Sequence, residues 1–405
     1  MTVAGIIAEY NPFHFGHRYL IQKARQEGAD AILCIMSGNF VQRADVAVCD
    51  KFSRAAMAVL EGADLVLELP VRYAIASAAE FARGGIKLLR ATGIANCLCF
   101  GSESGSQALY EMLQGLKKAE ASGLIRTQMK TGRSYPTARQ QAMEQTGTVC
   151  FPEKPNDILG LEYLLALEKL APNIRPMIFK RIGDYHSEQT QQGILSATGI
   201  RKLLYAEESA EPFVPKNTGR ILAEQKTQGR CPADLRQLER TILTFYRTTP
   251  PEQYANCIGY TEGLEHRVAD ASTAVSLDEF YRRIKTKRYT HSAVRRAVLC
   301  GLLGLQKTER EPAYLRTLAL NDTGRMLLRE IKKKGSLPVI PALTPQLLRN
   351  QTMSPWVREE LIAGEYFAFC LPYPAKRGRE LTESTRYFPG KTEPFHHNFE
   401  NFILF

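Results

Sequence analysis

Long hydrophobic runs are missing from this sequence of 405 residues. No window approaches the roughly 20 consecutive apolar residues that a membrane-spanning helix requires. The first residues, MTVAGIIAEYNPFHFGH, carry no basic segment before their apolar run, so we do not expect a secretory signal. Hydrophobic residues nevertheless make up 44% of the chain and charged residues 23%, which is typical of a globular protein with a sizeable core.

Paired cysteines are also missing. The nine cysteines are scattered, and none of them forms a Cys-x-x-Cys pair. Only Cys97 and Cys99 lie close together, at the spacing of two residues on one face of a strand. The pattern argues against a disulfide framework and against a structural zinc site, and it favours a protein of the reducing cytoplasm.

The usual glycine-rich phosphate motifs are absent as well. The chain contains no G-x-x-x-x-G-K-[ST] sequence, and no G-x-G-x-x-G follows its first apolar run. This disfavours a P-loop nucleotidase and a nicotinamide dinucleotide enzyme of the Rossmann type.

Charge is unevenly distributed along the chain. The formal net charge is +11, but residues 1–200 hold 21 Lys and Arg against 19 Asp and Glu, a balance of +2. The remaining residues hold 32 against 23, a balance of +9. A basic soluble surface is the ordinary explanation, whereas a polyanionic partner for the second half is the more specific one.

The first half alternates strand-like runs with helical patterns. The runs with strand character lie at residues 3–9, 31–36, 65–69, 97–100 and 174–181. Strands that alternate with helices of 10–15 residues predict βαβ units. We therefore expect an α/β fold with a doubly wound, Rossmann-like parallel sheet that is covered by helices on both faces.

The alternation ends near residue 205. From there on the pattern shows no convincing strand–helix alternation and predicts mostly helices, with a loop-rich stretch at residues 371–396. We expect residues 1–205 to form a catalytic, ligand-binding domain and residues 206–405 to form a mostly helical, basic region.

Polar segments follow the predicted strands, at the sheet edge where open parallel sheets bind ligands. The first of these segments contains His14-Phe15-Gly16-His17, at the change from strand to helix. Two imidazoles there would face a helix N-terminus, which attracts phosphate, and Gly16 lets a nucleotide approach the backbone closely. Imidazole N–H donors would stabilise charge on an α-phosphate during adenylyl transfer. The alternatives are two histidines with no shared role, or two metal ligands; no carboxylate or third histidine completes a recognisable metal pattern, so we expect no metal centre.

A second candidate segment is ILSATGIR, at residues 194–201. Ser196 and Thr198 are suited to capping a helix, and Arg201 offers a forked donor for phosphate oxygens. Taken alone, these residues favour the simpler alternative of a capped helix.

These two segments resemble the two signatures of the HIGH-type nucleotidylyltransferases, a superfamily that makes AMP adducts. Seven segments of the first half, taken in order, closely resemble the bacterial tRNA(Met) cytidine acetate ligase family. They are EYNPFHFGH (9–17), MSGNFVQR (36–43), ELP (68–70), FGSESG (100–105), KPNDILG (154–160), RIGDYH (181–186) and SATGIR (196–201). The match in the second half is thinner and rests on GLEHR (263–267) and KTKRYT (285–290).

The resemblance implies both a fold and a reaction. A sheet of the nucleotidylyltransferase type would bind ATP and activate acetate as acetyl-adenylate, with release of pyrophosphate. The acetyl group would then pass to N4 of the wobble cytidine of elongator tRNA(Met), with release of AMP. Acetyl-CoA is not the donor in this family, and Mg²⁺ is expected to accompany ATP.

The resemblance also implies site residues. His14 and His17 would be catalytic. The ATP-binding residues would be Ile7, Ala8, Glu9, Tyr10, Asn11, Pro12, Phe13, His14, Phe15, Gly16, His17, Arg18, Tyr19, Leu20, Gly101, Asn156 and Arg181. Ser196, Thr198 and Arg201 would be further phosphate contacts.

Three of these residues also have a physical reason of their own. Gly101 ends a predicted strand at the ligand-binding edge. The Asn156 amide is able to pair with a base or ribose, and the Arg181 guanidinium is able to hold phosphate. The alternatives are a helix cap for Asn156 and a surface ion pair for Arg181.

Other residues of the matching segments have less defined roles. Arg43 or Lys51 would neutralise the leaving pyrophosphate, although Lys51 is equally suited to a solvated position in a first helical turn. Gln42, Asp184 and His186 match without an assigned role.

Residues 281–296, YRRIKTKRYTHSAVRR, concentrate cations and aromatic side chains. The cations that we expect to bind tRNA are Arg282, Arg283, Lys285, Lys287, Arg288, Arg295 and Arg296. Cations for phosphates, interleaved with Tyr281, Tyr289 and His291 for stacking on a splayed-out base, are typical of an RNA-binding face. A solvated basic helix is the alternative. We expect no membrane partner, and the sequence does not define an oligomeric state.

Two other functions fit parts of the sequence. A small-molecule nucleotidylyltransferase that joins AMP to a phosphorylated metabolite would use the HFGH turn, but it leaves the basic second half unexplained. An RNA-binding protein with a degenerate nucleotide fold would not need an intact pair of histidines. The salt dependence of binding separates RNA from a metabolite, because phosphate contacts make RNA affinity fall steeply as salt rises.

Overall fold

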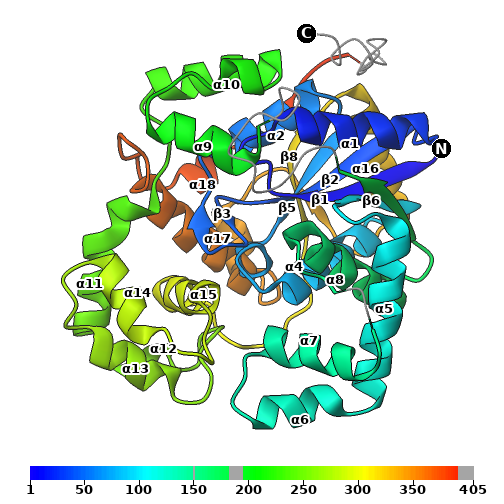
Figure 1. Cartoon of the computed structure of the whole chain (residues 1–405). Coiled ribbons are helices and arrows are strands. Elements are labelled where there is room, and N and C mark those ends of the chain that lie inside the picture. The colour runs from blue at the N-terminus through cyan, green and yellow to red at the C-terminus, as the bar shows by residue number, and fades with distance from the viewer. Residues whose placement is uncertain (149–150, 182–194, 391–405) are drawn as a thin grey trace.

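A mixed sheet of eight strands runs through the centre of the molecule, with helices on both faces (Figure 1). The computed structural model describes residues 1–148, 151–181 and 195–390. The strands of the sheet are β1 (Val3–Ala8), β2 (Ala31–Ser37), β5 (Leu65–Leu69), β6 (Cys97–Ser102), β7 (Arg175–Lys180), β8 (Leu315–Leu320), β9 (Val339–Ile340) and β10 (Arg386–Tyr387). A separate antiparallel hairpin consists of β3 (Phe40–Val41) and β4 (Asp45–Val46).

The strand order is β10-β8-β5-β2-β1-β6-β7, with β9 paired to β8. The five strands from β5 to β7 are mutually parallel, whereas β8 runs antiparallel to β5. The chain adds strands on one side of β1 and then on the other, so the topological switch point lies between β1 and β6. This arrangement confirms the predicted doubly wound sheet and places the ligand-binding crevice at the carboxyl ends of β1 and β6.

Helices make up most of the remaining chain. Those up to residue 205 are α1 (Phe15–Gln26), α2 (Lys51–Leu60), α3 (Val71–Ala74), α4 (Ala78–Ala91), α5 (Ser106–Ala121), α6 (Leu124–Lys130), α7 (Tyr135–Gln145), α8 (Pro155–Leu170) and α9 (Ala197–Tyr205). Those after it are α10 (Lys216–Thr227), α11 (Glu239–Thr248), α12 (Pro251–Tyr254), α13 (Leu264–Ala271), α14 (Leu277–Ile284), α15 (His291–Leu302), α16 (Asp322–Lys334), α17 (Ser354–Ala368) and α18 (Arg379–Thr382).

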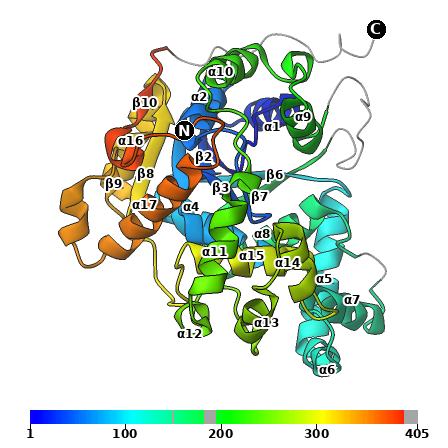
Figure 2. The same ribbon diagram turned by 90° about the vertical axis from the view of Figure 1, so that its left-hand side faces the viewer.

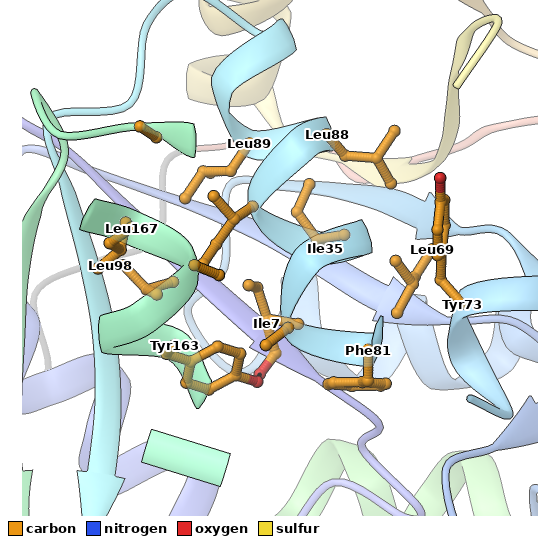
Figure 3. Close-up of a cluster of buried hydrophobic side chains, with 14 of the residues drawn as sticks. Ile7, Ile35, Leu69, Tyr73, Phe81, Leu88, Leu89, Leu98, Tyr163 and Leu167 are labelled. Carbon is orange, nitrogen blue, oxygen red and sulfur yellow. Dashed lines mark hydrogen bonds between the residues drawn. The ribbon is translucent and has the colours of Figure 1, made fainter. Parts of the chain in front are cut away.

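Strand alternation distributes the apolar side chains of β1 between two cores. Val3 and Ile7 face the core that α4 and α8 cover, and Ala4 and Ile6 face the core that α1 and α2 cover. Figure 3 shows the first of these cores, with Ile7 lying between Phe81 of α4 and Tyr163 of α8. Each fully buried apolar side chain of this size contributes about 1.5–3 kcal/mol to stability.

A third hydrophobic core lies away from the sheet. It is built by α11 to α15, which Figure 1 shows as a group of yellow-green helices at the lower left. The hairpin inserts Phe40 and Val46 into this core, and α17 adds Phe367. The helical group is therefore anchored on the loop that follows β2, which brings it next to the ligand-binding edge of the sheet.

The expectation that strand–helix alternation stops near residue 205 is wrong. Strands β8, β9 and β10 return to the sheet, and Figure 2 shows them with α16 and α17 on the side opposite β6 and β7. The run Leu315–Leu320 is buried at every position, because helices α2 and α16 pack against it, while β5 pairs with one of its edges and β9 and β10 with the other. The second half is mostly helical as expected, but it also completes the sheet of the first half.

Candidate active site

A cavity of about 370 Å³ opens at the carboxyl ends of β1 and β6, at the switch point of the sheet. The loop between β1 and α1 forms one wall, and the start of α8 and the start of α9 form others. The β3–β4 hairpin and helix α15 complete it. The predicted nucleotide edge of the sheet is therefore closed by elements from both halves of the chain.

The two histidines of the HFGH turn are held by the backbone of α1. His14 is the N-cap of α1, and its Nδ1 accepts a hydrogen bond from the Gly16 amide at 3.0 Å. Nδ1 of His17 accepts from the His14 amide at 3.2 Å, and the two rings stack with their centres 3.8 Å apart. Because both Nδ1 atoms are acceptors, the proton of each neutral ring is on Nε2. The pair thus has two Nε2–H donors left for a ligand in the cavity.

Burial keeps both rings neutral. Together with the neighbouring cations Arg181 and Arg201, it lowers the pKa of His14 to about 3. Burial also lowers the pKa of His17 well below its usual value, with His14 and Arg181 acting in the same direction. At neutral pH the rings are hydrogen-bond donors without charge, and the positive charge at this end of the cavity comes from the two arginines.

Gly101 and Arg181 meet at the end of β6. A Cβ atom at Gly101 would lie 2.8 Å from Cγ of Arg181, so only glycine leaves room for the arginine stem at this point. Asn156 stands in the first turn of α8, and its amide donates to Oε1 of Glu103 at 2.5 Å. Gly101, Arg181 and Asn156 all line the cavity. The N-cap of α8 is Lys154, so Asn156 is not the helix cap that the sequence offered as an alternative.

The start of α9 brings the second signature to the same cavity. Ser196 is the N-cap of α9, as its sequence suggests, and its Oγ accepts from the Gly199 amide at 3.2 Å. Arg201 donates to the Asn11 carbonyl at 2.7 Å and to the Thr198 hydroxyl at 3.2 Å. These bonds join α9 to the loop after β1, and Ser196, Thr198 and Arg201 all line the cavity.

A buried arginine fixes the loops that follow β1 and β2. Arg54 of α2 is fully buried, and it donates to the carbonyls of Glu9, Ser37 and Gly38. Oε1 of Glu9 in turn accepts from the Gln42 amide at 2.8 Å. The positions of the HFGH turn and of the hairpin are therefore set by one guanidinium, that of Arg54, which stands in none of the motifs identified from the sequence.

Comparisons with known proteins agree with this geometry. The family model described as HIGH nucleotidyl transferase matches residues 1–375. The tRNA(Met) cytidine acetate ligase of Acetivibrio thermocellus is 34% identical over 411 residues, which covers 95% of this chain and 99% of that protein. The protein of the same name from Thermosipho africanus is 37% identical over 369 residues and covers 86% and 87%. The chain belongs to the tRNA(Met) cytidine acetate ligase family.

Solved structures of the family have the same fold. The apo form of Thermotoga maritima TmcAL superposes with a TM-score of 0.87 at 29% identity, covering 96% of this chain and all of that one. A second form of the Thermotoga protein, bound with α-thio ATP, superposes with a TM-score of 0.86 at 30% identity and the same coverage. The fold predicted for the nucleotidylyltransferase type is thus confirmed over nearly the whole chain.

The structure brings most of the residues predicted to bind ATP to one place. Those that line the cavity are Ile7, Ala8, Glu9, Tyr10, Asn11, His14, His17, Leu20, Gly101, Asn156 and Arg181. Pro12, Phe13, Phe15, Gly16, Arg18 and Tyr19 belong to the same turn and helix but do not line it. Phe13 is fully buried and packs against Tyr10 and His17, so it supports the turn from beneath.

Lys51 does not reach the cavity, and the idea that it meets the leaving pyrophosphate is wrong. Its ammonium group is buried with Arg316 among Glu68, Glu360 and Glu380. Burial and the charge of Glu68 raise the pKa of Glu360 well above its usual value. Such a site excludes solvent and leaves Lys51 no access to a nucleotide. Arg43 lines the cavity.

The basic segment 281–296 divides into an outer and an inner part. The exposed cations are Arg282, Arg283, Lys285, Lys287 and Arg288. Arg283 pairs with Glu279 and Arg288 with Glu262. The other two cations point inward: Arg295 lines the cavity and pairs with Asp45, and Nε of Arg296 donates to the Ile75 carbonyl at 2.9 Å.

The aromatic residues of this segment differ in exposure too. Tyr281 is buried and forms part of the third core, so it is not available to stack on a base. Tyr289 is half-buried, and its hydroxyl donates to the Thr261 carbonyl at 2.7 Å. His291 is exposed at the start of α15, which leaves it as the aromatic side chain of the segment that is best placed to meet a base.

The sequence missed several residues of the cavity wall. Asp45, Tyr205 and Tyr163 line it, and none of them stands in a recognisable motif. Asp45 lies only two residues beyond the MSGNFVQR segment, and this closeness is the one sequence signal that could have identified it. Asp184 and His186 lie outside the described residues.

Within residues 1–148, 151–181 and 195–390, no helix is long and apolar enough to cross a membrane. The same residues contain no group of three His, Cys, Asp or Glu side chains that is arranged to hold a metal ion.

Proposed function

We propose that this protein is an ATP-dependent ligase of the cytoplasm that activates acetate as acetyl-adenylate and transfers the acetyl group to N4 of the wobble cytidine of elongator tRNA(Met). The products are AMP and pyrophosphate. The observation that carries the proposal is the neutral His14–His17 pair, whose Nε2–H donors lie at the switch point of a sheet shared with ligases of this name. A metabolite nucleotidylyltransferase would not account for the helical group of the second half, which supplies a wall of the same cavity.

Different residues of the cavity would bind different parts of ATP during adenylation. The Nε2–H groups of His14 and His17 would bind the α-phosphate at the start of α1, where charge develops as acetate attacks. Arg181 and Arg201 would balance the charge of the phosphates, and Ser196 and Thr198 offer hydroxyl donors beside Arg201. Gly101 and Asn156 would contact the nucleoside. We expect Mg²⁺ to enter with ATP, because proteins usually bind it through substrate phosphates and one or two carboxylates.

The exposed cations of residues 282–288 would bind the phosphates of tRNA. They occupy the end of α14 and the loop that leads into α15, the helix that reaches the cavity through Arg295. An RNA held on these side chains would lie beside the opening through which its base must enter. Arg296 would support α15 through its bond to α3 rather than touch the RNA.

Labelled acetate tests the whole reaction. Purified protein is incubated with ATP, Mg²⁺, carbon-labelled acetate and an elongator tRNA(Met) transcript, and the nucleosides are analysed by mass spectrometry. We expect labelled N4-acetylcytidine at the wobble position only, with no label when acetyl-CoA replaces ATP and acetate. Labelled adenylate without labelled RNA would instead restrict the activity to carboxylate activation.

A further inference from the structure

The cavity continues beyond the nucleotide-binding residues to a carboxylate and an arginine. Asp45 stands on β4 of the hairpin, and Arg295 comes from α15, 250 positions later in the chain. Nη2 of Arg295 donates to Oδ2 of Asp45 at 2.9 Å, and both side chains line the cavity. Neither is fully buried, since 40% of the Asp45 side chain and 25% of the Arg295 side chain are exposed.

Both groups retain capacity for a ligand. Oδ1 of Asp45 accepts from the Val46 amide and Oδ2 from Arg295, which uses two of the four or so lone-pair positions of a carboxylate. Arg295 also bonds to the hydroxyl of Tyr281, and its Nε–H, which has no hydrogen-bond partner among the described residues, is buried, so a ligand would have to use the Nη donors. Tyr281 and the hairpin therefore hold the pair in place while some of its donors and acceptors remain unused.

The chemistry of the pair matches one edge of a pyrimidine. Cytosine presents two acceptors, O2 and N3, next to the N4 amino group, which donates. A guanidinium beside a carboxylate offers the complementary pattern, because the first donates to O2 and N3 and the second accepts from N4. Uracil presents an acceptor where cytosine has the amino group, so the carboxylate would repel it.

We propose that Asp45 and Arg295 bind the cytosine that accepts the acetyl group, and that Asp45 takes the proton from its N4 atom. This rests on the function proposed above. As N4 attacks the acetyl-adenylate, the N–C bond forms and the C–O bond of the mixed anhydride breaks. AMP leaves with that electron pair, and the N4 proton moves to the Asp45 carboxylate.

Other groups of the cavity are less suited to this role. The Nδ1 atoms of His14 and His17 are already acceptors of backbone hydrogen bonds. The Tyr205 hydroxyl donates to the Ala233 carbonyl, and burial raises the pKa of that phenol, so it is no base. Glu9 is the other carboxylate of the cavity wall. Among the described residues no arginine pairs with it, so it lacks the neighbouring guanidinium that the cytosine edge requires.

Two assays on the same variants separate the two half-reactions. Acetate-dependent pyrophosphate exchange reports adenylation, and transfer from preformed acetyl-adenylate to tRNA reports the second step. We expect Asp45→Asn to lower the single-turnover transfer rate about 100-fold or more, the usual contribution of general base catalysis, with exchange changed less than threefold. Arg295→Lys keeps the charge but loses the fork, so we expect it to reduce the preference for a tRNA with cytidine over one with uridine at the wobble position.

A matched control removes another Arg–carboxylate ion pair. Arg220→Gln breaks the exposed pair with Glu224 on α10, and we expect neither assay to change. Thermal unfolding checks that each variant is folded. Three results would overturn the role of Asp45: a folded Asp45→Asn that loses exchange together with transfer, one whose transfer is unchanged, or loss of transfer in Glu9→Gln while Asp45→Asn stays active. An unchanged preference for cytidine in Arg295→Lys would overturn the role of Arg295. A wild-type protein without acetate-dependent exchange would instead refute the proposed function.

Discussion

His14 has two roles at the residue scale, because its two ring nitrogens face different partners. Nδ1 caps helix α1, and Nε2–H is left for the ligand. An alanine at this position would remove both, and the lost cap alone costs about 1 kcal/mol of stability. Asparagine is a good N-cap residue, so His14→Asn separates the chemical role from the structural one.

We expect His14→Asn and His17→Ala each to lower the rate of acetate-dependent pyrophosphate exchange by about 100- to 1000-fold, the usual loss for one transition-state donor. Binding of tRNA should stay within about twofold, because the exposed cations lie on other elements. Radiolabel exchange and filter binding measure the two quantities. A variant that lost both in equal measure would contradict the division of labour between the halves.

The low pKa of His14 has a consequence for stability. The unfolded chain binds a proton near pH 6.5 and the folded chain only near pH 3, so this residue contributes stability above pH 6.5 that is lost as the pH falls through that window. Between pH 7 and pH 5 the loss is about 2 kcal/mol for one such group. Urea unfolding at the two pH values measures it, and His14→Asn should show a smaller loss than the wild type. Equal losses in both proteins would mean that His14 titrates normally.

Sequence alone identified the site residues that stand in recognisable nucleotide-binding motifs. His14, His17, Gly101, Asn156 and Arg181 could be predicted because they stand in motifs, and each lines the cavity. Asp45 and Arg54 could not, because each acts through a tertiary contact with an element that is distant in the sequence. The predicted role of Lys51 was wrong for the same reason. Lys51 does lie in the first turn of a helix, but β8 and α17, which are distant in the sequence, cover it.

At the scale of elements, the segment from α14 to α15 joins the outer surface to the cavity. Its outer cations face solvent, and Arg295 and Arg296 anchor α15 to the hairpin and to α3. The sequence analysis identified the cations of this segment but did not separate the exposed side chains from those that turn inward. The structure shows that Tyr281, Arg295 and Arg296 turn inward. Strand β8 was missed because its six residues, LRTLAL, include an arginine and a threonine and follow several helices.

We expect the triple variant Arg282→Glu, Lys285→Glu and Lys287→Glu to weaken tRNA binding more than tenfold at moderate salt. The slope of log affinity against log salt should become shallower by about 2–3, since each of the three lost phosphate contacts removes about 0.7–0.9 of slope. Pyrophosphate exchange should be unchanged.

A triple variant on other helices provides the control for this charge reversal. Lys118→Glu, Arg126→Glu and Lys130→Glu change the same total charge at exposed positions of α5 and α6. If this control weakened tRNA binding as much as the first variant, net charge rather than the α14–α15 segment would be responsible.

At the scale of the whole molecule, the two halves are not independent. The sheet of the first half is extended by β8 to β10, and the ion cluster of Lys51 and Glu68 is completed by Arg316, Glu360 and Glu380. The predicted division at residue 205 lies after the five parallel strands β1, β2, β5, β6 and β7, and the chain beyond it supplies an edge of the sheet, with a further parallel pair of β8 and β9, and a wall of the cavity.

We expect a fragment of residues 1–205 to lack cooperative thermal unfolding and to bind a hydrophobic dye. Removing β8 uncovers the edge of β5, and removing α17 opens the buried charge cluster to solvent. Circular dichroism against temperature, with the full chain as the reference, measures this. A sharp transition in the fragment would mean that the first half folds without the returning strands.

The central claim is that the cavity at the switch point activates acetate with ATP before any RNA is involved. Exchange of labelled pyrophosphate into ATP, measured with and without acetate and in the absence of tRNA, tests it most directly. We predict exchange that requires acetate and that disappears in His17→Ala. Exchange that is independent of acetate, or that requires a phosphorylated metabolite in its place, would contradict the account.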